Sequence, residues 1–314
     1  MPDKSDRSGT IRHFRRLAST IVERYFETPA RRIVYRSSGL TNYVFSINHV
    51  EGQFVIRISP DPERIDAFRK EWWAVQQARK SGVPSPDILA VGNDVAAEPY
   101  MITRRVSGVE ASYHPKRPRI IHEIGRFAAV INSIRTTGFG SNFDWNPDGP
   151  KTATWSEYLD QEYRIGRRLE FFAKHRILPQ GELNRLSAII DETRTAEIRP
   201  ALNHSDLRLK NVIVDDDGEI TAIIDWEECL SAIAPQWELS IALHDLSIDE
   251  KHVFLDGYGL APERLTEMAP LIKAFNILNY QSAIASAIEK DDQKTLSEIT
   301  LRLNGTLDLF SLGC

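Results

Sequence analysis

The sequence predicts an α+β protein of two lobes, a small lobe built on an antiparallel sheet and a larger, mainly helical lobe. Short β-branched and aromatic runs separated by turns fill the region from residue 31 to residue 104. Apolar residues at helical spacing dominate from residue 119 onward. The length of 314 residues exceeds the usual size of one domain, so two packed lobes are expected. The predicted lobes are residues 1–106 and 107–314, with about the first ten residues disordered.

The smaller lobe is expected to begin with a hairpin whose strands cover residues 32–35 and 43–47. The turn between them is small and polar, and its residues of interest are Ser37, Ser38, Gly39, Thr41 and Asn42. Such a turn lets backbone N–H groups and hydroxyls approach phosphates. A plain hairpin turn would have the same sequence, so the turn alone leaves both interpretations open.

The third predicted strand, residues 52–58, carries a single charged residue, Arg57. A helix is expected at residues 62–81, and it contains Glu71. We expect Glu71 to pair with Arg57, although two separately solvated charges are the ordinary alternative. Two further strands complete this lobe, at residues 87–91 and 99–103.

The larger lobe is expected to consist mostly of helices. Their predicted ranges are 119–135, 154–178, 181–193, a helix that begins at 235, and a closing pair at 261–288 and 291–310. A loop rich in Gly, Asn and aromatic residues, 138–147, joins the first two helices. Its aromatic side chains would either line a ligand site or form local core, and the sequence leaves both open.

The most informative segment begins with H-S-D-L-R-L-K-N, residues 204–211. Two β-branched runs follow, joined by an Asp-rich turn that closes at Gly218, which is typical of a β-hairpin. An antiparallel hairpin returns the chain to its starting edge, so Asn211 and Asp225 should lie side by side, with Asp206 aimed at the same space. Mg²⁺ accepts such oxygen ligands together with substrate phosphates. Asp206 is then left to take a proton from an attacking hydroxyl.

The order H-x-D-x-x-x-x-N, hairpin, I-I-D-W-E resembles the aminoglycoside phosphotransferase and choline kinase superfamily, which has a protein-kinase-like fold. Protein kinases carry D-F-G after the hairpin, whereas this chain has Asp225-Trp226-Glu227, similar to the small-molecule branch. An ordinary exposed hairpin would account for an isolated H-x-D, but it would not account for the whole series of motifs.

The resemblance implies a nucleotide site in the smaller lobe and a catalytic site in the larger one. Asp206 would be the catalytic base, and Asn211 and Asp225 would hold Mg²⁺. Arg57 stands where kinase-like folds place a phosphate-binding Lys, and a guanidinium can fork onto phosphate oxygens. The resemblance also assigns nucleotide-binding roles to the turn 37–42, to Glu71, and to Thr103, Arg104 and Val106 at the hinge beside the purine. His204 and Glu238 would brace the catalytic loop, residues 204–211.

The activity implied is Mg²⁺-dependent transfer of a phosphate from ATP or GTP to a hydroxyl of a small molecule. Residues 1–110 carry a net charge of +4 and the remainder −9, which suits an anionic nucleotide and a cationic acceptor, although solvated surface explains most such excesses. Glu227 and Glu228 would border the acceptor or simply face water. An aminoglycoside-type antibiotic comes first as acceptor, because the Thr-Gly-Phe-Gly loop and the I-D-W-E run resemble hygromycin-type kinases.

Two alternatives to an antibiotic kinase remain open. One is a metabolic kinase that acts on choline, a sugar or homoserine, because the motifs report the donor chemistry and leave the acceptor undefined. The other is a non-catalytic nucleotide-binding pseudokinase, which thermal stabilisation by Mg-nucleotide without transfer would indicate.

Composition argues against several other classes. Two cysteines, Cys229 and Cys314, give neither a disulfide framework nor a metal-binding cluster. The polar amino terminus lacks the apolar core of a signal peptide, and no stretch approaches the length of a membrane span, so a cytoplasmic protein is expected. The overall charge of −5 disfavours nucleic-acid binding. The sequence does not choose between a monomer and a homodimer.

Overall fold

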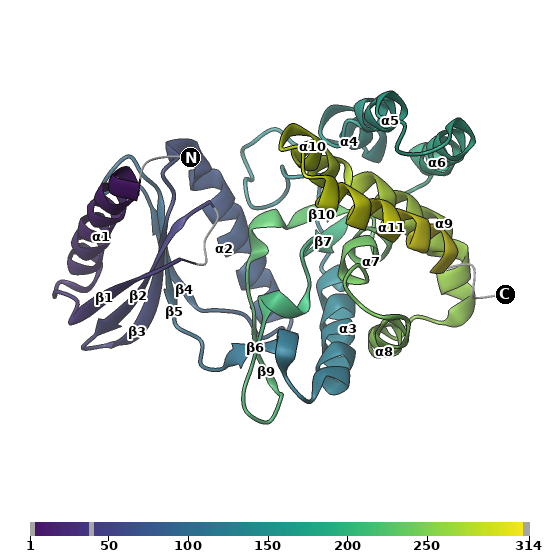
Figure 1. Ribbon diagram of the computed structural model, residues 1–314. Helices are drawn as coiled ribbons and strands as arrows, with labels where there is room; N and C mark the ends of the chain where they lie inside the picture. The colour runs from purple at the N-terminus through teal and green to yellow at the C-terminus, as the bar shows by residue number, and fades with distance from the viewer. Residues whose placement is uncertain (1–3, 38–40, 310–314) are drawn as a thin grey trace. The chain divides into compact units, whose positions relative to one another are not determined.

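The computed structural model describes residues 4–37 and 41–309 (Figure 1). The chain forms two compact units, residues 1–110 with 212–227 and residues 111–211 with 228–314. The predicted boundary at 106/107 is therefore slightly early, and the hairpin that follows Asn211 belongs to the first unit, contrary to the prediction. Backbone pairing is the reason, because β8 (Val212–Val214) pairs with β6 (Val109–Glu110).

A five-stranded antiparallel sheet forms the centre of the first unit, with the strand order β1-β2-β3-β5-β4. Its strands are β1 (Arg32–Arg36), β2 (Tyr43–His49), β3 (Gly52–Ile58), β4 (Ile88–Gly92) and β5 (Tyr100–Arg104). Each begins within one residue of its predicted position, which confirms the small antiparallel sheet expected from the sequence.

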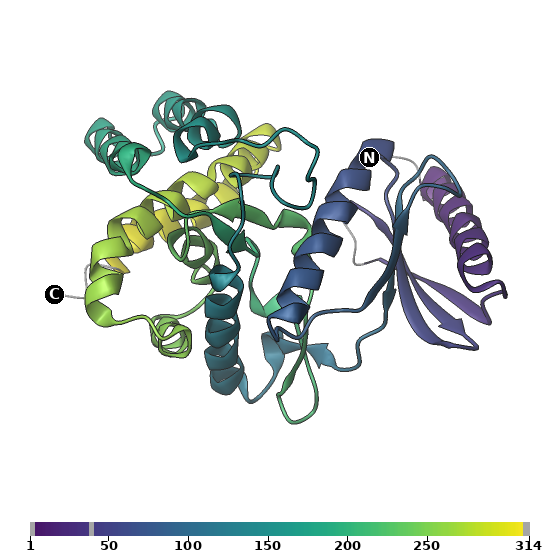
Figure 2. The ribbon, with the colours of Figure 1, turned by 180° about the vertical axis from the view of Figure 1, so that it is seen from behind.

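Two helices cover opposite faces of this sheet, α1 (Lys4–Phe26) on one side and α2 (Ile65–Lys80) on the other, as Figures 1 and 2 show. The period of two along β3 explains this arrangement. Phe54 and Ile56 face α1, where they join Phe14 and Ile21 in a buried cluster, while Arg57 faces α2. A short 3₁₀ turn, Pro62–Arg64, precedes α2 and carries Arg64 at its end.

The amino-terminal helix corrects the prediction of about ten disordered residues, because α1 begins at Lys4. Phe14, Ala18 and Ile21 are buried against the sheet and lie at helical spacing. This apolar spacing is the signal that could have predicted the helix from the sequence.

A three-stranded sheet, in the order β6-β8-β9, completes the first unit, with β9 at Ile220–Ile223. The N–H of Ile223 donates to the carbonyl of Pro84 at 2.8 Å, which ties β9 to the segment after α2. Thr221 Oγ1 donates to the Ser107 carbonyl at 3.0 Å, which ties it to the segment after β5.

The second unit is mainly helical, as predicted. Its helices are α3 (Arg117–Ser133), α4 (Trp155–Gln161), α5 (Ile165–Lys174), α6 (Gln180–Glu192), α7 (Gln236–Ala242), α8 (Ile248–Tyr258), α9 (Pro262–Asn279), α10 (Gln281–Glu289) and α11 (Gln293–Leu309). The shorter turns are Ala111–Tyr113, Thr193–Thr195 and Leu209–Asn211, and Trp226–Glu228 crosses from one unit to the other. A small antiparallel pair, β7 (Ala201–Asn203) with β10 (Leu230–Ala232), was not predicted.

The prediction of one helix over residues 154–178 is wrong, because the chain breaks between α4 and α5. Arg164 adopts the left-handed conformation with φ 56°, and an α-helix cannot continue through it. Glu162, just before the break, accepts hydrogen bonds from the Ser141 N–H at 2.9 Å and from Thr152 Oγ1 at 2.8 Å. The end of α4 is therefore fixed by the 138–147 loop and the segment after it.

Two further helix predictions need correction. The closing helical pair is a set of three helices, because the range 261–288 divides into α9 and α10 near Tyr280. Helix α8 was not predicted, although its sequence carries a capping box of Ser247 and Glu250 and ends at Gly259 with φ 74°.

Helices α3 and α8 approach each other at two glycines. A Cβ on Gly125 would lie 2.0 Å from the Phe254 carbonyl oxygen, and a Cβ on Gly257 would lie 2.0 Å from that of His122. Only a residue without a side chain permits this backbone contact.

In the described part of the chain, none of the helices has both the length and the apolar character required to span a bilayer.

Candidate active site

The β-hairpin predicted after the H-x-D motif is confirmed. Val212, the residue after Asn211, pairs with Ile223, two residues before Asp225. The turn is held by Asp215, whose Oδ1 accepts the N–H groups of Asp217 and Glu219, both at 2.9 Å. Asp225 itself is exposed and has φ 67°, a conformation that Asp tolerates better than most residues.

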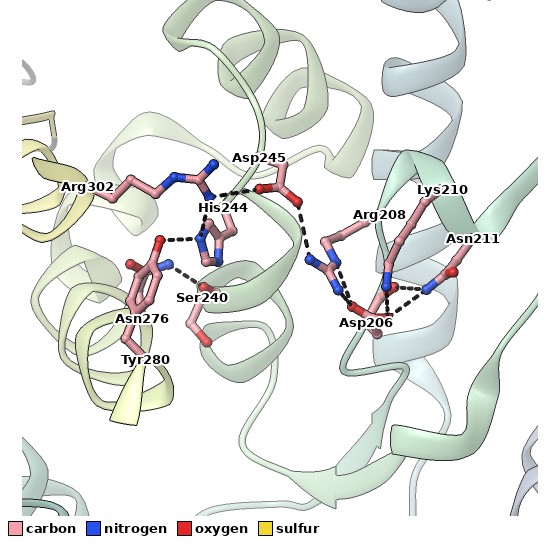
Figure 3. A network of polar contacts seen from close by, with 10 residues as sticks. All are labelled: Asp206, Arg208, Lys210, Asn211, Ser240, His244, Asp245, Asn276, Tyr280 and Arg302. Atoms are coloured by element: carbon pink, nitrogen blue, oxygen red, sulfur yellow. Dashed lines mark hydrogen bonds and ion pairs between the residues drawn. The ribbon is translucent and has the colours of Figure 1, made fainter. Parts of the chain in front are cut away.

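Asp206 and Asn211 are in direct contact in the second unit, where a loop after β7 carries both (Figure 3). Asn211 Nδ2 donates to Asp206 Oδ2 and to the Asp206 backbone carbonyl, both at 2.8 Å. Because the amide nitrogen is used in this way, the carbonyl oxygen of Asn211 is the end left to bind a cation. This orientation suits the magnesium role predicted for Asn211.

Two cations beside the Asp206 carboxylate were missed by the sequence reasoning. Arg208 Nε donates to Asp206 Oδ1 at 2.5 Å, and Lys210 Nζ lies 3.0 Å from Oδ2. Arg208 also contacts Asp245 at 3.2 Å, and Asp245 in turn pairs with Arg302 of α11 at 3.3 Å (Figure 3). Both cations lie within the motif itself, but sequence spacing shows only that Lys210 falls four residues after Asp206.

Glu238 lies against the backbone of the loop that contains Asp206. It is fully buried, and its Oε2 accepts the N–H of His204 at 2.5 Å and that of Ser205 at 3.3 Å. Burial raises the pKa of Glu238 to about 7, and the Asp206 charge adds to the increase, while the two backbone hydrogen bonds oppose it. His204 is buried as well, and its Nδ1 accepts the Asp206 N–H at 3.3 Å. These contacts fit the bracing roles that the resemblance implied for Glu238 and His204.

The predicted pairing of Arg57 with Glu71 is present in the first unit. Arg57 Nη2 lies 2.5 Å from Glu71 Oε1, and both side chains are largely buried. Burial by itself would lower the pKa of Arg57, but Glu71 outweighs it, and the charges of Asp225 and Glu227 raise that pKa further. Arg57, Glu71, Asp225 and Glu227 therefore share one electrostatic environment.

Glu227 is engaged by residues of its own unit, which the sequence did not predict. Arg64 Nη2 donates to Glu227 Oε1 at 2.7 Å, and Asn42 Nδ2 donates to Oε2 at 3.3 Å. Glu228 is exposed and makes no hydrogen bond or ion pair with the residues that the structure describes. Both Glu227 and Glu228 were predicted from the sequence to border the acceptor. Because Glu227 is already engaged by Arg64 and Asn42, this role is more favourable for Glu228.

The other predicted nucleotide contacts are placed only in part. Ser37 and Thr41 are exposed at the ends of the β1–β2 turn, whereas Ser38 and Gly39 lie outside the described residues. Further along the unit, the Arg104 N–H donates to the Asp87 carbonyl at 2.8 Å, so this amide is not available to a purine. The predicted hinge also includes Thr103, whose Oγ1 donates to Val55, and Val106, whose N–H finds no acceptor within the described ranges.

The residues present fit a magnesium nucleotide in their chemistry. Asn211 offers a carbonyl oxygen and Asp225 offers a carboxylate, both of which are oxygen ligands for a hard cation. Buried atoms without a hydrogen-bond partner among the described residues include Asn42 Oδ1, Arg64 Nε and Glu71 Oε2 in the first unit. Buried polar atoms are normally paired, so these three atoms have unused hydrogen-bonding capacity. Among the residues that the structure describes, no group of three or more His, Cys, Asp or Glu side chains is placed to hold a metal ion.

Comparison with known proteins gives matches at the level of sequence and of fold. The family described as "Phosphotransferase enzyme family" matches residues 32–271. Hygromycin-B 4-O-kinase of Escherichia coli is 21% identical over 240 residues, which is 68% of this chain and 63% of that relative. This chain therefore matches less than two thirds of that protein's length.

Solved structures of aminoglycoside phosphotransferases resemble most of the chain. A thermostable mutant of aminoglycoside phosphotransferase APH(4)-Ia, in ternary complex with ADP and hygromycin B, has a TM-score of 0.68 and 18% identity. The similarity covers 93% of this chain and 98% of that one. The GDP complex of wild-type aminoglycoside 2'-phosphotransferase-IIIa has a TM-score of 0.66 and 15% identity, covering 93% and 97%. The predicted kinase-like α+β fold is thereby confirmed.

Proposed function

Because the chain belongs to the phosphotransferase enzyme family, we propose that it transfers the γ-phosphate of ATP or GTP to a hydroxyl of a small, cationic acceptor. The observation that carries the proposal is the contact between Asp206 and Asn211 in the H-x-D-x-x-x-x-N loop. This contact supports a base and a metal ligand held in one loop. An aminoglycoside-type antibiotic is the acceptor class we propose first, because the named relatives act on or bind such compounds.

Asp206 would orient the acceptor hydroxyl and remove its proton. Its carboxylate is held by Asn211, Arg208 and Lys210. The buried Glu238 accepts the His204 N–H of the same loop. These contacts fix the carboxylate before the acceptor arrives, which lowers the entropic cost of aligning the two reactants.

Asn211 and Asp225 are the residues we propose to hold Mg²⁺, which would neutralise charge that develops on the phosphates. Arg57, fixed by Glu71, would grip the phosphates that are not transferred. The β1–β2 turn would approach the same phosphates with its backbone N–H groups, and Thr103 and Val106 would line the purine site. Glu228 remains available to a cationic acceptor.

The test is a panel assay in which the chain is incubated with ATP or GTP and Mg²⁺ against aminoglycosides, choline-like amines and sugars. We expect phosphorylated product with at least one aminoglycoside. Asp206→Asn should reduce turnover by roughly two to four orders of magnitude while Mg-nucleotide binding persists. Asp216→Asn is the matched control, because Asp216 is exposed on the hairpin turn and should leave turnover unchanged.

The panel also separates the competing functions. Product with choline-like amines or sugars alone would replace the antibiotic acceptor by a metabolic one. Stabilisation by Mg-nucleotide with no product from any acceptor would indicate a pseudokinase. Normal turnover of Asp206→Asn would show that the assigned base is wrong.

A further inference from the structure

Three distant segments of the first unit meet at the carboxylate of Glu227. Arg64, at the end of the 3₁₀ turn before α2, donates to one oxygen at 2.7 Å. Asn42, directly before β2, donates to the other oxygen at 3.3 Å. Glu227 stands two residues after Asp225. One side chain thus joins the end of the β1–β2 turn, the start of α2 and the segment that contains the proposed metal ligand.

The cluster is shielded from solvent, which makes these contacts more than surface ion pairs. The side chain of Glu227 is 14% exposed and that of Arg64 is 28% exposed, and Asn42 is buried. At such exposure a charged hydrogen bond is screened less by water than an exposed pair would be. Removing Arg64 or Glu227 would therefore leave the other charge largely shielded from water and without its partner.

The same carboxylate lies within electrostatic range of the Arg57–Glu71 pair. Helix α2, whose first turn follows Arg64, also carries Glu71. Arg64 and Glu71, the partner of Arg57, are therefore about two helical turns apart on one continuous segment. Glu227 is connected in this way to each part of the first unit that we assign to the phosphates.

We propose that Glu227 is a positioning residue for the nucleotide, with Arg64 and Asn42 as its partners, and that it does not bind the acceptor. This inference rests on the proposed kinase function. Both carboxylate oxygens of Glu227 accept hydrogen bonds from residues of the first unit, and its strongest contact is with a cation of the protein itself, Arg64 at 2.7 Å. Arg64 Nε and Asn42 Oδ1 have no partner among the described residues. Arg64 Nε is a donor and keeps capacity for a phosphate oxygen, whereas Asn42 Oδ1 is an acceptor and keeps capacity for an ordered water.

The experiment measures the affinity of the full chain for Mg·AMP-PNP and Mg·GMP-PNP by calorimetry, without any acceptor. We expect Glu227→Gln and Arg64→Gln each to weaken binding of the preferred nucleotide about tenfold. The double variant should also lose about tenfold, because the two residues act through one contact. Two independent contacts would give about a hundredfold loss. Arg64→Lys, which keeps the charge, should recover part of the loss.

Matched controls are available in the segment around Arg64. Glu63→Gln and Arg69→Gln remove the same charges from neighbouring exposed side chains, and both should leave nucleotide affinity unchanged. Thermal unfolding of every variant without nucleotide separates lost affinity from lost folding. In steady-state kinetics, Glu227→Gln should raise the KM for nucleotide and leave the KM for acceptor unchanged.

The possible outcomes are distinguishable. A wild-type chain that binds neither nucleotide would refute the proposed kinase function and this inference with it. If the wild type binds and Glu227→Gln binds equally well, only this inference fails. A rise confined to the acceptor KM, or additive losses in the double variant, would also overturn it.

Discussion

Replacing Glu238 by Gln should flatten part of the dependence of folding stability on pH. Glu238 is fully buried beneath the catalytic loop and has a pKa raised by burial from 4.5 to about 7. Between these two pH values, the native state keeps a proton on Glu238 that the unfolded chain has already released. Stability from this group is therefore present in full below pH 4.5 and is lost as the pH rises through about 7.

The magnitude follows from the size of the shift. An increase of roughly 2.5 pKa units corresponds to about 3 kcal/mol, at about 1.4 kcal/mol per unit. Glutamine keeps the size of the side chain and an oxygen acceptor for the His204 and Ser205 N–H groups, but it does not titrate in this range. The difference in unfolding free energy, wild type minus Glu238→Gln, should fall by roughly 2–3 kcal/mol between about pH 5 and about pH 8.

Urea unfolding of both proteins across this pH range measures the difference directly. Glu192→Gln is the control, because Glu192 is exposed at the end of α6 and is solvated whether the chain is folded or unfolded. Parallel pH profiles for wild type and Glu238→Gln would refute the reasoning, since they would mean that Glu238 titrates alike in both states. A difference that grows with pH would show that Glu238 is stabilised as a carboxylate.

Three further predictions concern the core and the proposed metal. Arg57→Met should lower the free energy of unfolding, measured in urea, by about 3 kcal/mol, because it leaves Glu71 buried without its partner. Replacing both residues should restore most of this loss, and equal destabilisation in the double variant would contradict the prediction. Gly125→Ala should cost about 2 kcal/mol or more in thermal unfolding, because its Cβ would lie 2.0 Å from a backbone oxygen of α8, whereas Gly166→Ala has nothing within 4 Å and should be nearly neutral. Asp225→Asn should raise the Mg²⁺ concentration required for half-maximal turnover at least about tenfold, and an unchanged Mg²⁺ dependence would remove Asp225 from the metal site.

The strands of the five-stranded sheet and the hairpin β8–β9 could be predicted from the sequence because their signals are local. Alternation along residues 52–58, and an Asp-rich turn closed by Gly218, depend only on neighbouring residues. The contact between Asp206 and Asn211 is local in the same sense, because the two residues are five positions apart in one short loop. The helix α1 was missed in spite of an equally local signal.

Other features depended on contacts between residues far apart in the chain. The break between α4 and α5 lies beside Glu162, whose carboxylate is held by Ser141 and Thr152. No periodicity near residue 162 reports these partners. The grouping of residues 212–227 with the first unit likewise depends on the pairing of β8 with β6.

The sequence by itself determined the strand pattern, the order of the motifs and the identity of Asp206, Asn211 and Asp225 as the residues to test. Only the tertiary structure decided which charges meet. Arg208 lies between Asp206 and Asp245, and Glu227 binds Arg64, which is 163 residues away in the chain. The physical reason is that strand and turn signals come from adjacent residues, whereas the partner of a buried charge is set by how distant elements pack.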